Sequence, residues 1–182
     1  MAKATHGRTT VLLVAIAALL TGCSPDAPAG PFPPRPADID TTSVDLCAAL
    51  TTEQQDELGV EAGEPDSAEL GDGPTRLCGW SNYRNGYNYS VQTTPVPAAV
   101  AVGTPDSTVQ EIDGYGVVQV TANETSAPLC TYYVDTSDNL GLRTLTQLTG
   151  RDMRNESGAI EEVCQRAKAF TTQVIQNLRP AE

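Results

Sequence analysis

Histidine, basic side chains and long hydrophobic runs are all scarce in this sequence. Its 182 residues include one histidine, His6, and 11 lysines and arginines against 23 aspartates and glutamates. Because no histidine follows position 6, the rest of the chain lacks the usual general base and a common zinc ligand. The formal net charge of −12 argues against the basic surface on which nucleic acids bind. We therefore expect no nucleic-acid partner and no cofactor.

The first 23 residues have the pattern of an export signal that ends in a cysteine. A basic start is followed by an apolar run at residues 11–20 and by Leu-Thr-Gly-Cys at residues 20–23. A membrane-spanning helix needs about twenty apolar residues, so the run is too short to persist as a span. Residues 20–23 resemble the lipobox of bacterial lipoproteins, which predicts a signal peptide at residues 1–22 and lipid on Cys23. The alternative is an ordinary signal peptide with a chance cysteine after the cleavage site. Lipid on Cys23 would hold the mature chain at the outer face of the cytoplasmic membrane, in the cell envelope.

The rest of the chain divides into a tether at residues 23–41 and one domain at residues 42–182. Six prolines lie between positions 25 and 36. A Pro-rich segment extends by about 3.1 Å per residue, so we expect the tether to stay unpacked and to lift the domain on the order of 50 Å from the lipid. The remaining residues have the length of a single domain with one core.

The sequence has five cysteines, of which Cys23 is assigned to the lipid. The other four, Cys47, Cys78, Cys130 and Cys164, are even in number and belong to a chain exported to an oxidising compartment. This predicts two disulfides. A cysteine-only zinc site is the alternative, but such sites contain closely spaced Cys-x-x-Cys pairs, which are missing here.

The beginning of the domain predicts a short turn and then a helix. Thr51 and Gln54 have the spacing of a capping box, and Gly59 has the position of a C-terminal cap. Residues 53–72 contain many acidic and no basic side chains. We interpret them as a solvated helix face followed by a loop broken by glycine and proline. Calcium binding is the alternative, although the alternating oxygen ligands of a calcium loop are absent.

A hairpin at residues 77–93 is the clearest strand signal, because Asn-Gly at residues 85–86 favours a tight turn. With a two-residue loop, Trp80 faces Val91, and Cys78 points inward beside Trp80 on a largely apolar side. The other side is polar, which predicts an antiparallel sheet covered on one side only. The same inward alternation recurs later in the chain at Val118, Val120, Cys130, Tyr132, Val134, Leu140 and Leu142.

Helical periodicity at residues 160–178 predicts a final helix with Cys164 in its buried stripe. The predicted fold class is therefore α+β: an antiparallel β-sheet with helices packed on one face, stapled by two disulfides. Cys47 and Cys164 are expected on helices, and Cys78 and Cys130 on the sheet. If each bridge joins a helix to the sheet, two of the three pairings remain. We favour Cys47 with Cys78 and Cys130 with Cys164, which need shorter excursions of chain, and the other pairing stays open.

Aromatic side chains on the hairpin suggest a contact surface. Trp80 and Tyr89 are interpreted as core, whereas Tyr83 and Tyr87 lie near the hairpin tip and are predicted to be exposed contacts for sugar or a partner protein. Residues 96–102 are apolar and bracketed by prolines. They either pack under the edge of the domain or form a partner-binding patch.

No catalytic motif set is present in the sequence. A serine hydrolase without histidine usually employs a lysine base, but Lys168 is accompanied by neither GxSxG nor SxxK. Ser-Asp-Asn at residues 137–139 matches one motif of penicillin-interacting enzymes without its partner motifs, and we interpret it as turn chemistry. A pair of carboxylates could hydrolyse glycosides, yet no pair stands out among so many acids.

The order of several motifs resembles a known family. After the lipobox and the Pro-rich segment come Asp-Leu-Cys-Ala-Ala-Leu-Thr at residues 45–51, Leu-Gly at residues 58–59, Cys-Gly-Trp at residues 78–80 and Gly-Tyr at residues 114–115. Together with a late cysteine-bearing helix, these resemble actinobacterial lipoproteins of domain of unknown function 3558. Members often have a middle helix where this chain has the Ala-, Val- and Pro-rich residues 95–105. The resemblance implies a place in the cell envelope and an α+β fold, and it carries over no catalytic residue.

We therefore expect binding, not catalysis, as the function. The predicted protein is a non-catalytic binding or interaction module, anchored to the membrane through lipid on Cys23, whose partner is an envelope protein, a glycan or a lipid. Two alternatives stay open. One is a carrier that holds a lipid or small apolar ligand between helices and sheet, and the other is a carboxylate-based hydrolase of envelope material.

Overall fold

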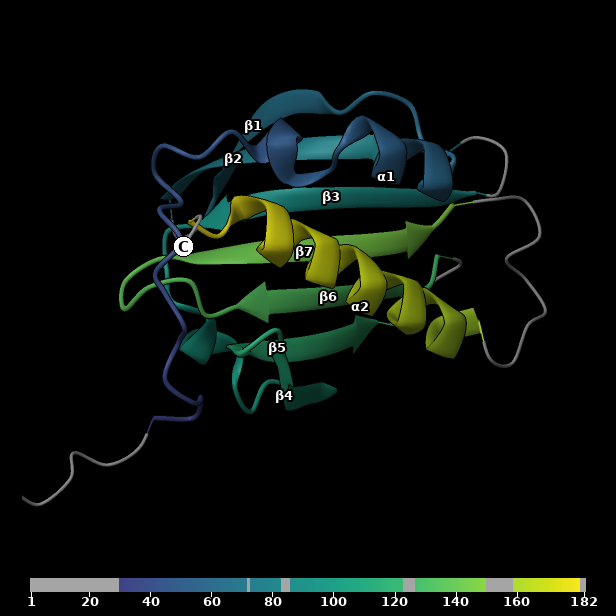
Figure 1. Ribbon diagram of the computed structural model, residues 1–182. Helices are drawn as coiled ribbons and strands as arrows, with labels where there is room; N and C mark the ends of the chain where they lie inside the picture. The colour runs from purple at the N-terminus through teal and green to yellow at the C-terminus, as the bar shows by residue number, and fades with distance from the viewer. Residues whose placement is uncertain (1–29, 72, 83–85, 123–126, 150–158, 181–182) are drawn as a thin grey trace, which may run out of the picture.

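The computed structural model describes residues 30–71, 73–82, 86–122, 127–149 and 159–180. Its main feature is a seven-stranded antiparallel sheet in the order β1-β2-β3-β7-β6-β5-β4, crossed on one face by the long helix α2 (Figure 1). The predicted α+β class is therefore confirmed. The strands are β1 (Glu64–Leu70), β2 (Gly73–Ser81), β3 (Tyr87–Thr94), β4 (Ser107–Ile112), β5 (Tyr115–Ala122), β6 (Leu129–Val134) and β7 (Gly141–Leu148). The helices are η1 (Leu46–Ala49), α1 (Thr52–Leu58), η2 (Ala98–Ala101) and α2 (Ala159–Leu178).

The helix α1 begins and ends as its sequence predicts. The Thr51 side chain accepts a hydrogen bond from the backbone N–H of Gln54, and the Gln54 side chain accepts one from the backbone N–H of Thr51. Gly59 then adopts the left-handed conformation, with φ of 65°, which ends the helix. The preceding turn is η1, which buries Leu46 and Ala49.

The acidic segment that the sequence predicts to be a loop instead forms the edge strand β1. Its residues pair with β2 from Glu64 opposite Gly79 to Leu70 opposite Gly73. An edge strand pairs through its backbone on one side only, so it needs few apolar side chains. Acidic side chains on such an edge also discourage pairing with further chains. The loop prediction is wrong here because it rested on the acidic side chains, the glycines and the proline, and did not consider backbone pairing at the edge of a sheet.

The predicted hairpin is present, but its register is displaced by two residues. Trp80 lies opposite Tyr89, and Cys78 lies opposite Val91. The backbone N–H of Asn82 donates to the carbonyl of Tyr87, so the connection is longer than the predicted two-residue loop. Because side chains alternate with a period of two, this shift leaves Cys78 and Trp80 on the inner face. Asn85 and Tyr83 lie outside the described residues.

The core lies between α2 and the inner face of the sheet. Phe170 of α2 is fully buried, and its ring lies 5.8 Å from that of Trp80 and 5.3 Å from that of Tyr89. Two disulfides join the helices to the sheet. Cys47 of η1 is bonded to Cys78 of β2, and Cys164 of α2 is bonded to Cys130 of β6. The favoured pairing is confirmed, and each bridge links a helical element to a strand.

Residues 30–41 pack on the sheet, and we call this segment the strap. Ile39 is 1% exposed, and its backbone N–H donates to the carbonyl of Thr136 at 3.0 Å. Arg35 forms ion pairs with the carboxylates of Asp38, Asp135 and Asp138. The expectation that the whole Pro-rich tether stays unpacked is therefore wrong over these residues. Proline content alone misled it, since Ile39 and Arg35 supply an apolar anchor and a charged clamp. Residues 23–29, with Cys23, lie outside the described residues.

The sheet face opposite α2, which we call the outer face, is only partly exposed. The predicted inward direction of Val118 and Val120 is wrong, because their neighbours Val117 and Gln119 occupy the side of α2. Val118 is nonetheless fully buried, because η2 and the strap cover this part of the outer face. A Cβ built on Gly116 would lie 2.4 Å from Phe32 of the strap, so only glycine allows this approach. Gln92, predicted on the polar side, is 4% exposed.

Candidate functional site

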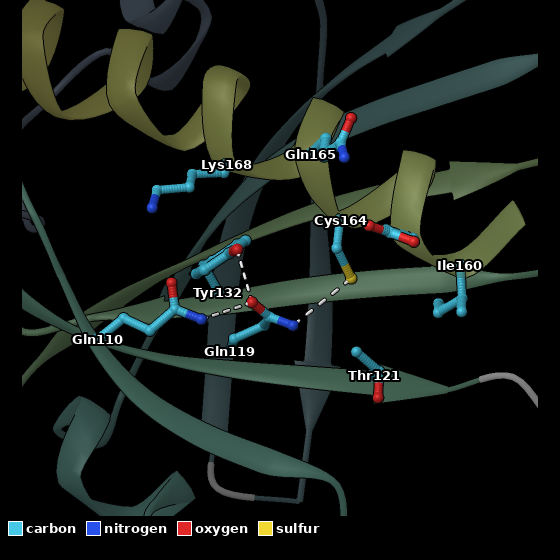
Figure 2. A pocket seen from close by; sticks show the side chains of 9 residues that line it. Gln110, Gln119, Thr121, Tyr132, Ile160, Cys164, Gln165 and Lys168 are labelled. Carbon is cyan, nitrogen blue, oxygen red and sulfur yellow. Dashed lines mark hydrogen bonds between the residues drawn. The ribbon is translucent and has the colours of Figure 1, made fainter. Parts of the chain in front are cut away.

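A groove opens beside α2 on the inner face of the sheet, and we call it the helix-side groove. The helix packs on β3, β7 and β6, so the inner faces of β4 and β5 extend beyond its cover. The groove between these strands and α2 has a volume of about 390 Å³ (Figure 2). This is within the range of about 300–1,000 Å³ in which proteins bind small ligands.

Uncharged polar groups form the floor of the groove. The Gln119 Oε1 atom accepts hydrogen bonds from Gln110 Nε2 at 2.7 Å and from the Tyr132 hydroxyl at 2.8 Å. The other end of the same amide donates from Nε2 to the Cys164 Sγ atom at 3.6 Å. Figure 2 shows these three contacts converging on Gln119. Burial raises the pKa of Tyr132 to about 12, so its hydroxyl stays protonated and donates at neutral pH.

The wall of the groove comes from one side of α2. Ile160, Cys164 and Lys168 recur every four residues and therefore lie on the same face of the helix. Glu161 and Gln165 lie beside them. Besides the disulfide sulfur of Cys164, the wall thus contributes one apolar side chain, one amide and one charge of each sign.

The disulfide between Cys130 and Cys164 fixes the groove. Cys130 is fully buried on β6, whereas Cys164 is partly exposed on α2 and lines the groove. The Cα atoms of the two residues are 5.1 Å apart. This covalent link holds the wall of the groove against its floor.

Residues 18–177 match the family described as protein of unknown function (DUF3558). The match spans most of the chain. This protein belongs to the DUF3558 family. A comparison with curated proteins finds no match.

Among solved structures, this DUF3558 protein is similar to a crystal structure from Bacteroides thetaiotaomicron, with a TM-score of 0.37 and 10% sequence identity. The similarity covers 65% of this chain and 42% of the other, so this chain matches less than half of that protein.

The contact surface predicted from the sequence of this DUF3558 protein is not found at Tyr87. Tyr87 is 6% exposed, and the Arg166 guanidinium lies 4.3 Å from the centre of its ring. The prediction is wrong for Tyr87 because it considered only the hairpin, whereas a side chain of α2 covers the ring. Tyr83 lies outside the described residues. Trp80 and Tyr89 are core residues, as predicted, with 1% exposure each.

Sequence reasoning missed the amides of the helix-side groove. Gln119 follows the valines of β5 and points to the same side as Val117, which is core. A polar residue at an inward position of an apolar strand was the available signal. Tyr132 was predicted to share its face with Cys130 and Val134, and all three are buried.

The Ser-Asp-Asn motif lies in the β6–β7 connection, where Ser137 Oγ accepts a hydrogen bond from the Leu140 N–H and Asp138 pairs with Arg35. This is the turn role that the sequence predicts.

Within the described residues, no group of three His, Cys, Asp or Glu side chains could hold a metal ion. No helix in the described part of the chain is long and apolar enough to cross a membrane.

Proposed function

We propose that this protein is a non-catalytic binding module of the cell envelope, anchored by lipid on Cys23 at the outer face of the cytoplasmic membrane. Its helix-side groove binds a neutral envelope ligand that carries hydroxyl and amide groups, such as a segment of glycan. The observation that carries this proposal is the floor of uncharged hydrogen-bonding groups centred on Gln119.

The anchor is supported by the sequence before the strap. Residues 20–23 have the complete lipobox pattern after a short apolar run, and the family match begins at residue 18, within that leader. An acylated cysteine contributes about 0.8 kcal/mol per buried methylene, and several chains together hold a protein stably on a bilayer. The acidic chain adds no electrostatic attraction to anionic lipid, so the lipid is the membrane contact.

The chemistry of the groove favours a neutral ligand. Amides and hydroxyls can each donate and accept, which suits the hydroxyl and acetamide groups of a sugar. Lys168 and Glu161 contribute opposite charges, so the pair favours no ligand of one sign. The Cys130–Cys164 bridge holds these groups in place before the ligand arrives, which reduces the entropic cost of binding.

The same lining favours binding over the two alternative functions. Hydrolysis of a glycoside by carboxylates requires two of them on either side of the bond. Of the described residues that line the helix-side groove, Glu161 supplies the one carboxylate. A carrier would need a cavity between α2 and the sheet, and that space holds the packed rings of Trp80, Tyr89 and Phe170.

A titration with tri-N-acetylchitotriose tests the groove. We expect NMR shift changes confined to Gln110, Gln119, Gln165 and their neighbours in the mature polypeptide. Gln119→Leu should weaken binding about tenfold, because it leaves the Tyr132 hydroxyl and the ligand without their amide partner. The matched control is Gln176→Leu, on an exposed part of α2 outside the groove. Shift changes elsewhere, or equal binding by the two variants, would refute the proposed site.

Membrane fractionation tests the anchor. Wild-type chain should sediment with membranes and take up labelled fatty acid, whereas Cys23→Ser should do neither. The neighbouring Ser24→Ala substitution serves as control and should keep both properties. A Cys23→Ser protein that remains in the membrane fraction would contradict the lipid anchor.

A further inference from the structure

The outer face of the sheet carries a second groove, separate from the one beside α2, and we call it the outer groove. It lies between residues 94–105, which include η2, and strands β5, β6 and β7, with a volume of about 450 Å³. Much of its lining is apolar and includes Pro95, Val100 and Val120. Val100 is 56% exposed, so apolar surface is accessible at its rim. Of the described residues that line this groove, Arg143 is the one with a cationic side chain.

The position of Arg143 on the outer face follows from the strand alternation of β7. Its neighbour Thr144 points to the helix side, where its hydroxyl lies 2.6 Å from that of Thr171 on α2. Arg143 therefore projects from the opposite face. On that face, its partners across the strands are Tyr133 of β6 and Gln92 of β3.

The guanidinium of Arg143 is poorly satisfied within the protein. The Arg143 Nη2 atom donates a hydrogen bond to Gln92 Oε1. The Gln92 side chain is buried, and its Nε2 atom donates to the Thr75 hydroxyl at 2.7 Å. The Arg143 Nε atom is buried without a hydrogen-bond acceptor. Across the described residues, Arg143 forms no ion pair. A guanidinium offers five N–H donors and keeps its charge in proteins, so donors and charge are left over.

Three other arginines of the structure have hydrogen-bond or ion-pair partners within the protein. Arg35 contacts three carboxylates, and Arg166 contacts Glu162. Arg76 donates to the backbone carbonyls of residues 41, 42 and 44. The sequence has 23 acidic residues, yet Arg143 has an uncharged amide as partner. A half-buried cation without a counter-charge is costly, which gives an anion from outside a place to bind.

We propose that the outer groove binds a small amphiphile with a single carboxylate, whose head contacts Arg143 and whose alkyl chain lies along Val100, Val120 and Pro95. One cation matches an anion of one charge, whereas a phosphate monoester carries about two charges near neutral pH. A planar guanidinium also suits a planar carboxylate. The groove volume is in the range for small ligands. This site is independent of the lipid on Cys23 and of the helix-side groove.

Calorimetry with decanoate tests the proposal. The mature polypeptide carrying Cys23→Ser, with its disulfides formed, is titrated at neutral pH with decanoate below its micelle concentration. Acetate provides the head alone, 1-decanol the chain alone, and decyltrimethylammonium the opposite charge. We expect decanoate to bind at least about tenfold more tightly than each of the three, because only decanoate uses both Arg143 and the apolar lining. Equal affinity for decanoate and decanol would overturn the proposal.

Substitutions test whether the carboxylate of decanoate contacts Arg143. Arg143→Gln should weaken decanoate binding by about 10- to 100-fold and leave decanol binding unchanged, and Arg143→Lys should restore part of the affinity. Lys168→Gln removes a cation from the helix-side groove and should change decanoate affinity by less than about twofold, since it lies on the opposite face.

A further variant tests the outer groove while Arg143 stays in place, in case the Arg143 variants misfold. Val120→Glu places a carboxylate in the outer groove without altering Arg143. It should abolish decanoate binding through charge repulsion and competition for the guanidinium, with the thermal transition retained. Unchanged decanoate affinity in Val120→Glu, or a stronger loss in Lys168→Gln than in Arg143→Gln, would overturn the assignment to the outer groove.

Discussion

The inner face of the sheet has two halves, both bordered by α2. They differ in what fills the space between the helix and the strands. Over β2 and β3, Trp80 and Tyr89 meet Phe170 and the space is filled. Over β4 and β5, Gln110 and Gln119 form a polar floor and a groove of about 390 Å³ remains. Seven strands spaced about 4.8 Å apart make a sheet much wider than one helix, whose diameter is about 10–12 Å. The packed half therefore maintains the fold, and the uncovered half is available for binding.

Truncation at the centre of the packed half should have the largest effect on stability. Phe170→Ala removes a fully buried ring from between Trp80 and Tyr89 and should lower the free energy of unfolding by about 3–5 kcal/mol. Ile160→Ala, at the wall of the helix-side groove, serves as the matched comparison and should cost less than about 1.5 kcal/mol. Urea unfolding measures both. Equal losses would show that the two halves are packed alike.

The two disulfides should contribute nearly equally to the free energy of unfolding. Only the Cys130–Cys164 bridge should also hold the side chains of the helix-side groove in place. The bridges join residues 31 and 34 positions apart, so the loop-closure contribution of each is about 3–4 kcal/mol. Replacing Cys47 and Cys78 together by Ser, or Cys130 and Cys164 together by Ser, should lower the unfolding free energy by similar amounts. Only the second pair of substitutions should shift the side-chain amide resonance of Gln119 strongly. A strong shift from the first pair would mean that the halves are coupled.

Loss of the Arg35 clamp should have a moderate effect. Arg35→Gln leaves Asp135, whose side chain is 9% exposed, without its cation and should cost about 1–3 kcal/mol in thermal or urea unfolding. Asp138→Asn removes a partner that is 86% exposed and should cost less than about 0.5 kcal/mol. If both substitutions cost the same, the clamp acts through surface charge and not through the buried pair.

Alkaline pH should reveal a smaller contribution of the polar floor. Because burial raises the pKa of Tyr132 to about 12, above its unfolded value of about 10, the folded state favours the neutral phenol. This contribution is fully present below pH 10 and is lost as the pH rises through 12. Tyr132→Phe should cost about 0.5–1.5 kcal/mol at pH 7, through the lost hydrogen bond to Gln119, and should flatten the decline of stability above pH 10. If Tyr132→Phe loses stability above pH 10 as steeply as the wild type does, the loss comes from other tyrosines.

Local chemistry made the packed half largely predictable. The capping box of Thr51 and Gln54, the turn at Gly59 and the periodicity of α2 each depend on residues close in sequence. Placing Cys47 and Cys164 on helices left two of the three disulfide pairings open, and the structure has the one favoured for its shorter chain excursions. The two-residue shift of the hairpin did not affect these predictions, since it preserved which side chains face inward.

The strap, the edge strand and both grooves depend on contacts between distant residues. Arg35 and Asp135 are a hundred positions apart, and neither residue alone indicates the pair. Gln119 and Arg143 are ordinary strand residues until the topology shows what covers each face. Of the apolar residues 96–102, the structure places Val96, Val100 and Ala101 in the lining of the outer groove, which the sequence alone could not indicate.

The strap also sets how far the protein can act from its anchor. Phe32 packs closely against Gly116 of the sheet, so residues 24–31 lie between Cys23 and this contact. A fully extended chain spans at most about 3.3–3.6 Å per residue, which limits this leash to about 30 Å in place of the 50 Å expected of a free tether. With the proposed lipid on Cys23, the grooves operate within the layer directly above the bilayer. Under that proposal, a ligand farther from the bilayer must diffuse to the protein.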